Sequence, residues 1–280
     1  MYTNEFSFNI NNRNLSLIKE NFINLKEEES SPINIKEYKI SIEETRPIMI
    51  SWLSFLCSKL NFSDQTLFRC ISIFDQYISK IPQEQSNKLD KDYLSLIAIA
   101  CLSLATKLEE INCNYVSFFT QKVLNLPNCA IFSVKDLTKM EMCILKELNY
   151  KTLYTTSYDF MLFYLDIFRY FFNPPFTFIQ NIKNCTEVIM KQNIMSNIFL
   201  NMTQSDYAYA CLNQAFMQIG TNNNIMNQIR NILMIFDMNK IIKKNKSLIM
   251  NNSGNDNDII DNDDNLHHNL EVNLLSLPSF

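Results

Sequence analysis

Residues 98–111 have the sequence AIACLSLATKLEEI. Apolar and small residues recur in it at the spacing of a helix, so that Ala98, Cys101 and Ala105 fall on one face. Small side chains let neighbouring helices approach closely, which a helix with neighbours on all sides requires. The segment therefore predicts a buried central helix in an all-helical core. We expect this helix to begin after Asp90, whose carboxylate can cap its first turn.

Two helices are expected before the central one and two after it. An apolar stripe over residues 48–60 predicts the first helix. Ser63 is suited to cap the second helix, and Pro82 is expected to end it. A short fourth helix is expected from Asn114 to Leu124. These helices, joined by short connections, form with the last one a five-helix bundle.

The fifth helix carries clear signals at both of its ends. Ser133 and Asp136 have the spacing of a capping box, in which each side chain bonds the backbone amide of the other. The apolar stripe continues to Leu148, and Asn149 is suited to end the helix. We therefore expect this helix to cover residues 134–148.

A related sequence, AYACLNQA (Ala208 to Ala215), agrees with AIACLSLA at five of eight positions, 110 residues later. A second set of helical stripes surrounds it. These stripes predict helices at residues 160–168, at 176–195, from Thr203 or Ser205 to Gly220, and at 225–236. Two copies of one five-helix unit explain the match, although coincidence between two Ala-rich helices explains it as well.

Composition divides the chain into four parts. The segment 1–40 is rich in Asn and charge and is expected to be flexible. Residues 41–155 hold the first bundle and residues 156–248 the second helical domain. Residues 249–280 form a polar, acidic tail that has too few apolar residues to fold, so we expect it to be disordered.

The composition also excludes several classes of enzyme. The chain has 280 residues, of which 47% are hydrophobic and 19% charged, so most of it can fold around a core. Its glycines, Gly220 and Gly254, do not form a phosphate-binding loop, which argues against Rossmann and P-loop nucleotide sites. Histidine occurs only at His267 and His268, so a histidine-based catalytic or metal site is not expected.

No cofactor or metal is expected, because the eight cysteines are singly spaced rather than paired like zinc ligands. The net charge of −4 argues against binding to nucleic acid. No apolar run is long enough to cross a bilayer, so neither a membrane partner nor a membrane anchor is expected. We expect an intracellular protein of the nucleus, the cytoplasm or both.

Four segments of the first bundle together resemble the cyclin box. They occur in the family's order and spacing, and the resemblance covers about residues 46–160. They are RPIMISWL (Arg46 to Leu53), FDQYIS (Phe74 to Ser79), LATKLEEI (Leu104 to Ile111) and KMEMCILKELNY (Lys139 to Tyr150). The resemblance implies two tandem five-helix cyclin-fold repeats, of which the second is divergent.

The resemblance implies a non-catalytic subunit that binds a cyclin-dependent kinase, activates it and controls cell-cycle progression. In cyclins, a lysine of the third helix and a glutamate of the fifth lie side by side and bond the kinase. Lys107 and Glu141 stand at these positions. The kinase-binding residues implied in this way are Lys107, Leu108, Glu110, Glu141, Leu145 and Tyr150.

The resemblance also implies a groove that docks substrates or inhibitors of the kinase. Its residues here are Ile48, Met49, Trp52, Phe55, Leu94 and Ser95. Phe55 and Ser95 stand where mitotic cyclins often carry a carboxylate and an amide, so a groove here is apolar or unused. An ordinary core explains the same apolar stripe equally well. These departures leave the cyclin subtype open.

Two short signals lie in the first forty residues. Lys19, Glu20 and Asn21 spell a degradation motif of mitotic regulators, and Ser31 with Pro32 forms a minimal proline-directed phosphorylation site. Both strings also arise by chance in a chain rich in Lys, Glu and Asn.

Two other functional classes remain to be weighed. A cyclin-fold adaptor in transcription regulation, similar to general transcription factor B or to retinoblastoma-type pockets, would hold other proteins without activating a kinase. An all-helical enzyme would need a carboxylate site, for which Glu109, Glu110 and Glu141 are candidates. No metal-ligand pattern joins these three residues, so we expect no enzyme.

Overall fold

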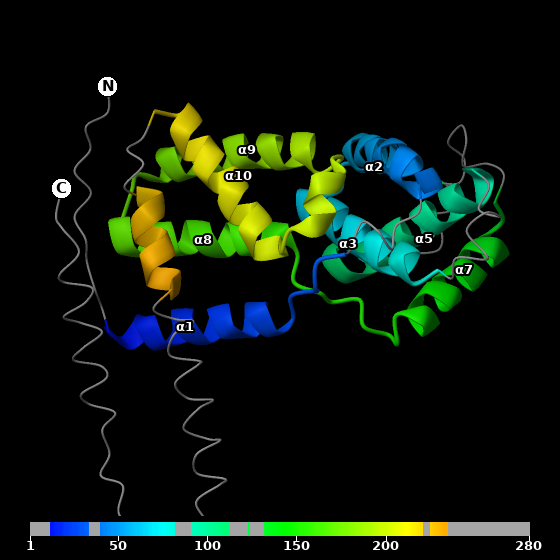
Figure 1. The fold of residues 1–280 in the computed structure, drawn as a ribbon, viewed down its shortest axis with the longest axis horizontal. Coiled ribbons are helices and arrows are strands. Elements are labelled where there is room, and N and C mark those ends of the chain that lie inside the picture. Colours follow the sequence, from blue (N-terminus) through cyan, green and yellow to red (C-terminus); the bar gives the residue numbers. More distant parts are fainter. Residues whose placement is uncertain are drawn as a thin grey trace, which may run out of the picture. The chain divides into compact units, whose positions relative to one another are not determined.

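Helices make up the fold of this chain (Figure 1). The computed structural model describes residues 12–33, 40–81, 91–111, 123, 132–220 and 225–234. Over these residues the β-structure is limited to one isolated parallel bridge between Glu29 and Thr155, which confirms the predicted all-α class. None of the helices in these ranges has the length and apolar character needed to cross a membrane.

Helix α5 (Lys91–Glu109) is the centre of one packed unit. Its residues 97–106 are all buried, at most 6% exposed, so this helix has neighbours on every side. The neighbours that pack against it are α2 (Ile40–Leu60), α3 (Asp64–Lys80) and α7 (Val134–Glu147), as Figure 1 shows. The buried central helix expected from the small residues of this segment is therefore confirmed.

The predicted caps of α3 and α7 are present. Ser63 Oγ accepts from Thr66 N at 3.2 Å at the start of α3. At the start of α7, Ser133 Oγ accepts from Asp136 N and Asp136 Oδ2 accepts from Ser133 N, both at 3.2 Å. Side chains that bond the first amides of a helix typically stabilise it by about 1 kcal/mol. These local signals therefore fix where both helices begin.

Helix α7 ends slightly differently from the prediction. Leu148 is its C-cap, and Asn149 follows it with φ 51°. Tyr150 also adopts a positive φ, 60°, which is uncommon for an aromatic residue. Its amide donates to Leu145 O at 2.7 Å, a bond that closes the turn after the helix.

A buried ion pair joins α2 to α3. Arg46 Nε and Nη2 donate to the two carboxylate oxygens of Asp75 at 2.8 and 2.7 Å. Arg46 is 0% exposed and Asp75 2%. Arg46 Nη1 donates to Ile194 O at 3.1 Å, and Arg46 Cζ lies 5.7 Å from the ring centroid of Phe199. This arginine therefore ties three parts of one packed unit together.

The segment 28–33 is held by backbone bonds at both of its ends. Thr155 N donates to Glu28 O at 3.1 Å, and Ile33 N donates to Leu200 O at 2.9 Å. Between them, Glu29 Oε1 accepts from Ser205 N at 2.7 Å. These bonds fix a segment that has no helix or strand of its own.

Helix α1 (Asn12–Glu27) differs from the flexible segment expected over residues 1–40. Phe22 is 3% exposed, and its ring stacks on Phe163 with the centroids 5.7 Å apart. Ile18, Phe22 and Leu25 recur at helical spacing, a stripe hidden by the polar average of the segment. One buried ring and two half-buried apolar side chains thus give a packed face to a stretch whose overall composition is that of a flexible one.

The second set of helices follows the predicted stripes closely. It comprises α8 (Ser157–Phe172), α9 (Phe176–Asn193), the 3-10 helix η2 (Asn197–Asn201), α10 (Gln204–Gln218) and a helical stretch at residues 225–234. Phe168 is 0% exposed and lies 5.3 Å from Phe172, 6.1 Å from Phe178 and 5.1 Å from Phe216, measured between ring centroids. This aromatic cluster joins residues of α8, α9 and α10 that belong to the same compact unit.

The matched positions of the internal repeat are mostly buried in both helices, α5 and α10. Four matched positions are buried in both α5 and α10: Ala98 and Ala208, Cys101 and Cys211, Leu102 and Leu212, and Ala105 and Ala215. The fifth match differs, because Ala100 is buried whereas Ala210 is exposed. Helix α10 therefore has an open face that α5 lacks, and the tandem arrangement is only partly visible.

The described residues divide into two compact units. One holds the described residues 28–33, 40–81, 91–111, 123, 132–162 and 184–212, and the other holds residues 12–27, 163–183, 213–220 and 225–234. The domain boundary expected near residue 155 stays a prediction. The predicted cap at Asp90, the predicted helix from Asn114 to Leu124 (apart from Val123) and the tail 249–280 lie outside the described residues.

Candidate functional site

Lys107 and Glu141, which the sequence places 34 residues apart, meet across two packed helices. Lys107 lies in the last turn of α5 and Glu141 near the middle of α7. Lys107 Nζ lies 2.7 Å from each carboxylate oxygen of Glu141. Ser103, one turn earlier in α5, also donates its hydroxyl to Glu141. Two side chains of α5 therefore fix the direction of this carboxylate.

The pair is open to solvent on the lysine side. The Lys107 side chain is 38% exposed, whereas the Glu141 side chain is 12% exposed. An ion pair as exposed as this one contributes only about 0–1 kcal/mol to stability. What the arrangement supplies is an oriented cation and carboxylate at the surface, suited to bond the polar groups of a partner.

Several apolar side chains of the chain segments that carry this pair are exposed. Leu108 is 40% exposed and Tyr150 64%, while Leu145 is half-buried. Ile111, just beyond α5, is 96% exposed, and Met142, beside Glu141, is 44% exposed. Exposed apolar groups around a fixed polar pair are typical of protein–protein contacts. Ile111 and Met142 were not among the predicted site residues. They could have been found in the sequence as apolar residues that lie outside the buried stripe of their helix.

Glu110, also predicted to contact a kinase, is bonded within the chain to the start of α3, and its part in kinase binding stays a prediction. Its Oε1 accepts from Ser63 N at 2.8 Å, from Ser63 Oγ at 3.0 Å and from Thr66 Oγ1 at 2.6 Å. Burial acts to raise the pKa of Glu110, but the hydrogen bonds from Thr66 and Ser63 outweigh it and lower the pKa. Glu110 thus binds the first turn of α3 by one of its oxygens.

Replacing Glu110 by glutamine is therefore expected to lower the stability of the folded chain. A carboxylate with a lowered pKa stabilises the folded chain above its unfolded pKa of about 4.3, and the contribution is lost as the pH falls below it. We expect Glu110→Gln to lower the free energy of unfolding by about 1 kcal/mol at pH 7, since solvent weakens these bonds. Urea unfolding at pH 7 and pH 3 tests this, and an equal loss at both values contradicts it.

The residues of the predicted docking groove separate into three groups by their exposure. Met49 and Leu94 are each 4% exposed and belong to the core. Trp52 and Ser95 are half-buried, and the hydroxyl of Ser95 donates to Lys91 O at 2.8 Å within its own helix. Ile48 and Phe55 are each 58% exposed, and Lys59 Nζ lies 5.7 Å from the ring centroid of Phe55. The exposed part of this region is therefore an apolar strip on α2.

The two short signals of the first forty residues fall on ordered backbone. Lys19, Glu20 and Asn21 lie within α1, where Lys19 is half-buried and the other two are exposed. Ser31 and Pro32 are exposed and belong to the bonded segment 28–33. Their use as signals stays a prediction.

The three candidate carboxylates of an enzyme site have separate partners. Glu109 accepts from Arg69, Glu110 from Ser63 and Thr66, and Glu141 from Lys107 and Ser103. The part of the chain that the structure describes also contains no group of three His, Cys, Asp or Glu residues able to hold a metal ion. These three carboxylates therefore do not share a partner in the structure.

Comparison with known proteins gives one consistent result. Residues 17–153 match the family model described as "Cyclin, N-terminal domain". Cyclin-D1-1 of Arabidopsis thaliana is 29% identical over 166 residues, which are 58% of this chain and 45% of that protein. The G2/mitotic-specific cyclin-B2 of Gallus gallus is 25% identical over 162 residues, 58% of this chain and 33% of that protein. The matches thus span less than half the length of these two relatives.

A solved structure shares the fold. The viral cyclin from herpesvirus saimiri superposes with a TM-score of 0.55 and covers 79% of this chain and 94% of its own. The sequences are 17% identical, so this likeness concerns the fold alone.

Proposed function

Because this chain belongs to the cyclin family, we propose that it binds a cyclin-dependent serine/threonine kinase and activates it in the control of cell-cycle progression. A cyclin-type regulatory role follows from the family, whose members are regulatory subunits. That the partner is a cyclin-dependent kinase, and that this chain activates it, is what we propose beyond this regulatory role. The oriented pair of Lys107 and Glu141 is the observation that carries the proposal.

The chemistry of this pair suits a partner's main chain. An ammonium group donates to carbonyl oxygens and a carboxylate accepts from backbone amides, and hydrogen bonds to charged groups are roughly twice as strong as neutral ones. Burial of Leu108 and Tyr150 under the partner would remove water from around these bonds. Since Glu141 is already held by α5, little side-chain entropy would be lost on binding.

Activation is proposed to be a shift between two states of the kinase. In protein kinases, a lysine that contacts ATP must pair with a glutamate of a regulatory helix. A partner that binds the paired state more tightly raises the population of that state. The chain would supply this difference in affinity, while the chemistry stays in the kinase.

The test is an activity assay with a panel of purified cyclin-dependent kinases and a generic basic peptide substrate. We expect the full chain to raise the rate of phosphate transfer by at least one kinase about tenfold or more, with saturation at one chain per kinase. Capture of a kinase without a rise in rate would favour an adaptor and contradict the proposed activation. Failure to capture any kinase would contradict the proposal as a whole.

A further inference from the structure

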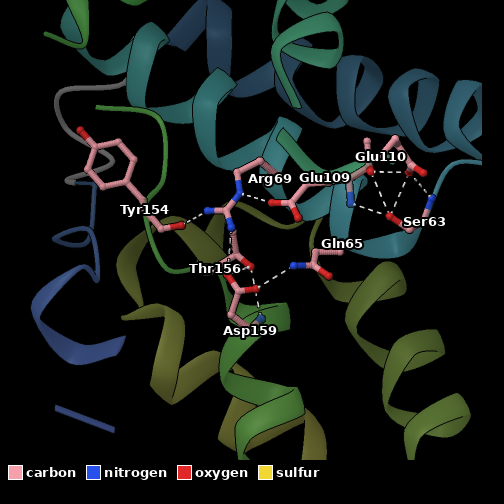
Figure 2. A network of polar contacts seen from close by, with 9 residues as sticks. Ser63, Gln65, Arg69, Glu109, Glu110, Tyr154, Thr156 and Asp159 are labelled. Atoms are coloured by element: carbon pink, nitrogen blue, oxygen red, sulfur yellow. Dashed lines mark hydrogen bonds and ion pairs between the residues drawn. The ribbon is translucent and has the colours of Figure 1, made fainter. Parts of the chain in front are cut away.

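Arg69 lies at the centre of a buried polar cluster in α3 (Figure 2). The residue is 6% exposed. Its Nε donates to Glu109 Oε1 at 2.6 Å, its Nη2 lies 3.3 Å from Asp159 Oδ2, and its Nη1 donates to the carbonyl of Tyr154. One guanidinium therefore joins the end of α5, the start of α8 and the segment that leads to α8.

The contact with Glu109 resolves an electrostatic problem at the end of α5. Glu109 is the last residue of this helix, and Glu110 follows it directly. Two adjacent carboxylates at the negative end of a helix repel both the helix dipole and each other. Arg69 binds the first and the start of α3 binds the second, as Figure 2 shows. Lys107 and Leu108 lie in the turn immediately before these two residues, so the same contacts fix that turn.

The second carboxylate that Arg69 contacts, Asp159, lies in the first turn of α8. Asp159 Oδ2 accepts from Thr156 N and from Thr156 Oγ1, both at 2.8 Å, and Asp159 Oδ1 accepts from Gln65 at 3.4 Å. Thr156 Oγ1 in turn accepts from Asp159 N at 3.3 Å, which makes a cap for α8. The same guanidinium thus contacts one carboxylate that holds α5 and another that caps α8.

We propose that Arg69 is a positioning residue for the kinase-binding face: by holding Glu109, it fixes the last turn of α5 and so the direction of Lys107 and Leu108. This inference rests on the proposed function, since the face matters only if a kinase binds there. By this inference a buried arginine of α3, which does not itself touch the kinase, contributes to kinase binding by orienting the exposed residues.

Two isosteric substitutions distinguish a role of Arg69 in positioning the kinase-binding face from a role in the stability of the fold alone. Glu109→Gln and Asp159→Asn each remove one carboxylate from the same guanidinium, so both are expected to lower the melting temperature. Only Glu109→Gln loosens the end of α5. We expect it to weaken binding to the captured kinase at least fivefold and to speed amide exchange at residues 107–111 about tenfold. Asp159→Asn is expected to keep both quantities within twofold of the parent. Arg69→Met is less suitable, since it leaves two carboxylates buried and can unfold the chain.

The outcomes distinguish this inference from the proposed function. If the parent binds a kinase and the two variants bind it equally well or equally poorly, Arg69 does not position the face. Exchange at residues 107–111 that stays unchanged in Glu109→Gln overturns the inference as well. If the parent binds no kinase, the proposed function is wrong and the inference falls with it.

Discussion

Replacement of both Lys107 and Glu141 by alanine is expected to weaken binding to the kinase about 100-fold. Hydrogen bonds to charged groups are worth about 1.5–3 kcal/mol each, and the loss of two of them amounts to roughly 3 kcal/mol, or two powers of ten. The helical circular dichroism should stay that of the parent, because a partly exposed ion pair contributes little to stability. Isothermal titration with the captured kinase measures the change.

A matched control is available in the same packed unit. Lys191 Nζ lies 2.9 Å from Asp64 Oδ2, and the two side chains are 37% and 24% exposed, so this pair has a similarly exposed lysine. Its double alanine variant is expected to bind the kinase like the parent. Equal losses in the two double variants would mean that binding responds to surface charge in general and not to Lys107 and Glu141.

The substitution of Arg46 by methionine is expected to have the largest effect on stability. It removes every hydrogen bond of a fully buried guanidinium and leaves Asp75, 2% exposed, without this counter-charge. Breaking a buried pair from one side typically costs about 3–5 kcal/mol, a large share of the stability of a domain. Urea unfolding followed by circular dichroism measures the loss.

The companion variant Arg46→Met with Asp75→Leu tests the reason for this loss. Replacing both partners by apolar residues removes the unpaired charge, so we expect the double variant to recover most of the stability. A loss below about 1 kcal/mol in the single variant would contradict a structural role for the pair. A double variant no more stable than the single one would show that packing, and not charge, causes the loss.

The parts of the fold that could be predicted from sequence are those set by near neighbours in the chain. The buried helix at residues 97–106 follows from a run of small and apolar residues, and the caps at Ser63 and Ser133 follow from residues three positions apart. Helix α1 was missed because a short apolar stripe with Phe22 lies in a polar segment. Composition averages over such a stripe, whereas packing depends on it.

The parts of the site that depend on distant residues could not be derived from spacing. Lys107 and Glu141 were paired by resemblance to a family, because nothing local joins residues 34 positions apart. Glu110 was predicted as a kinase contact, and its bonds to the start of α3 were not foreseen, since its partner Ser63 lies 47 positions earlier. Neither Arg46 nor Arg69 was predicted to be buried. Only tertiary packing makes them the centres of buried clusters.

The most direct test of this account is a structure of the full chain bound to the kinase that it captures. We expect Lys107 Nζ and the Glu141 carboxylate to lie within about 3 Å of main-chain atoms of the kinase, beside its regulatory helix. A complex in which the kinase binds elsewhere and both side chains face solvent would contradict the account.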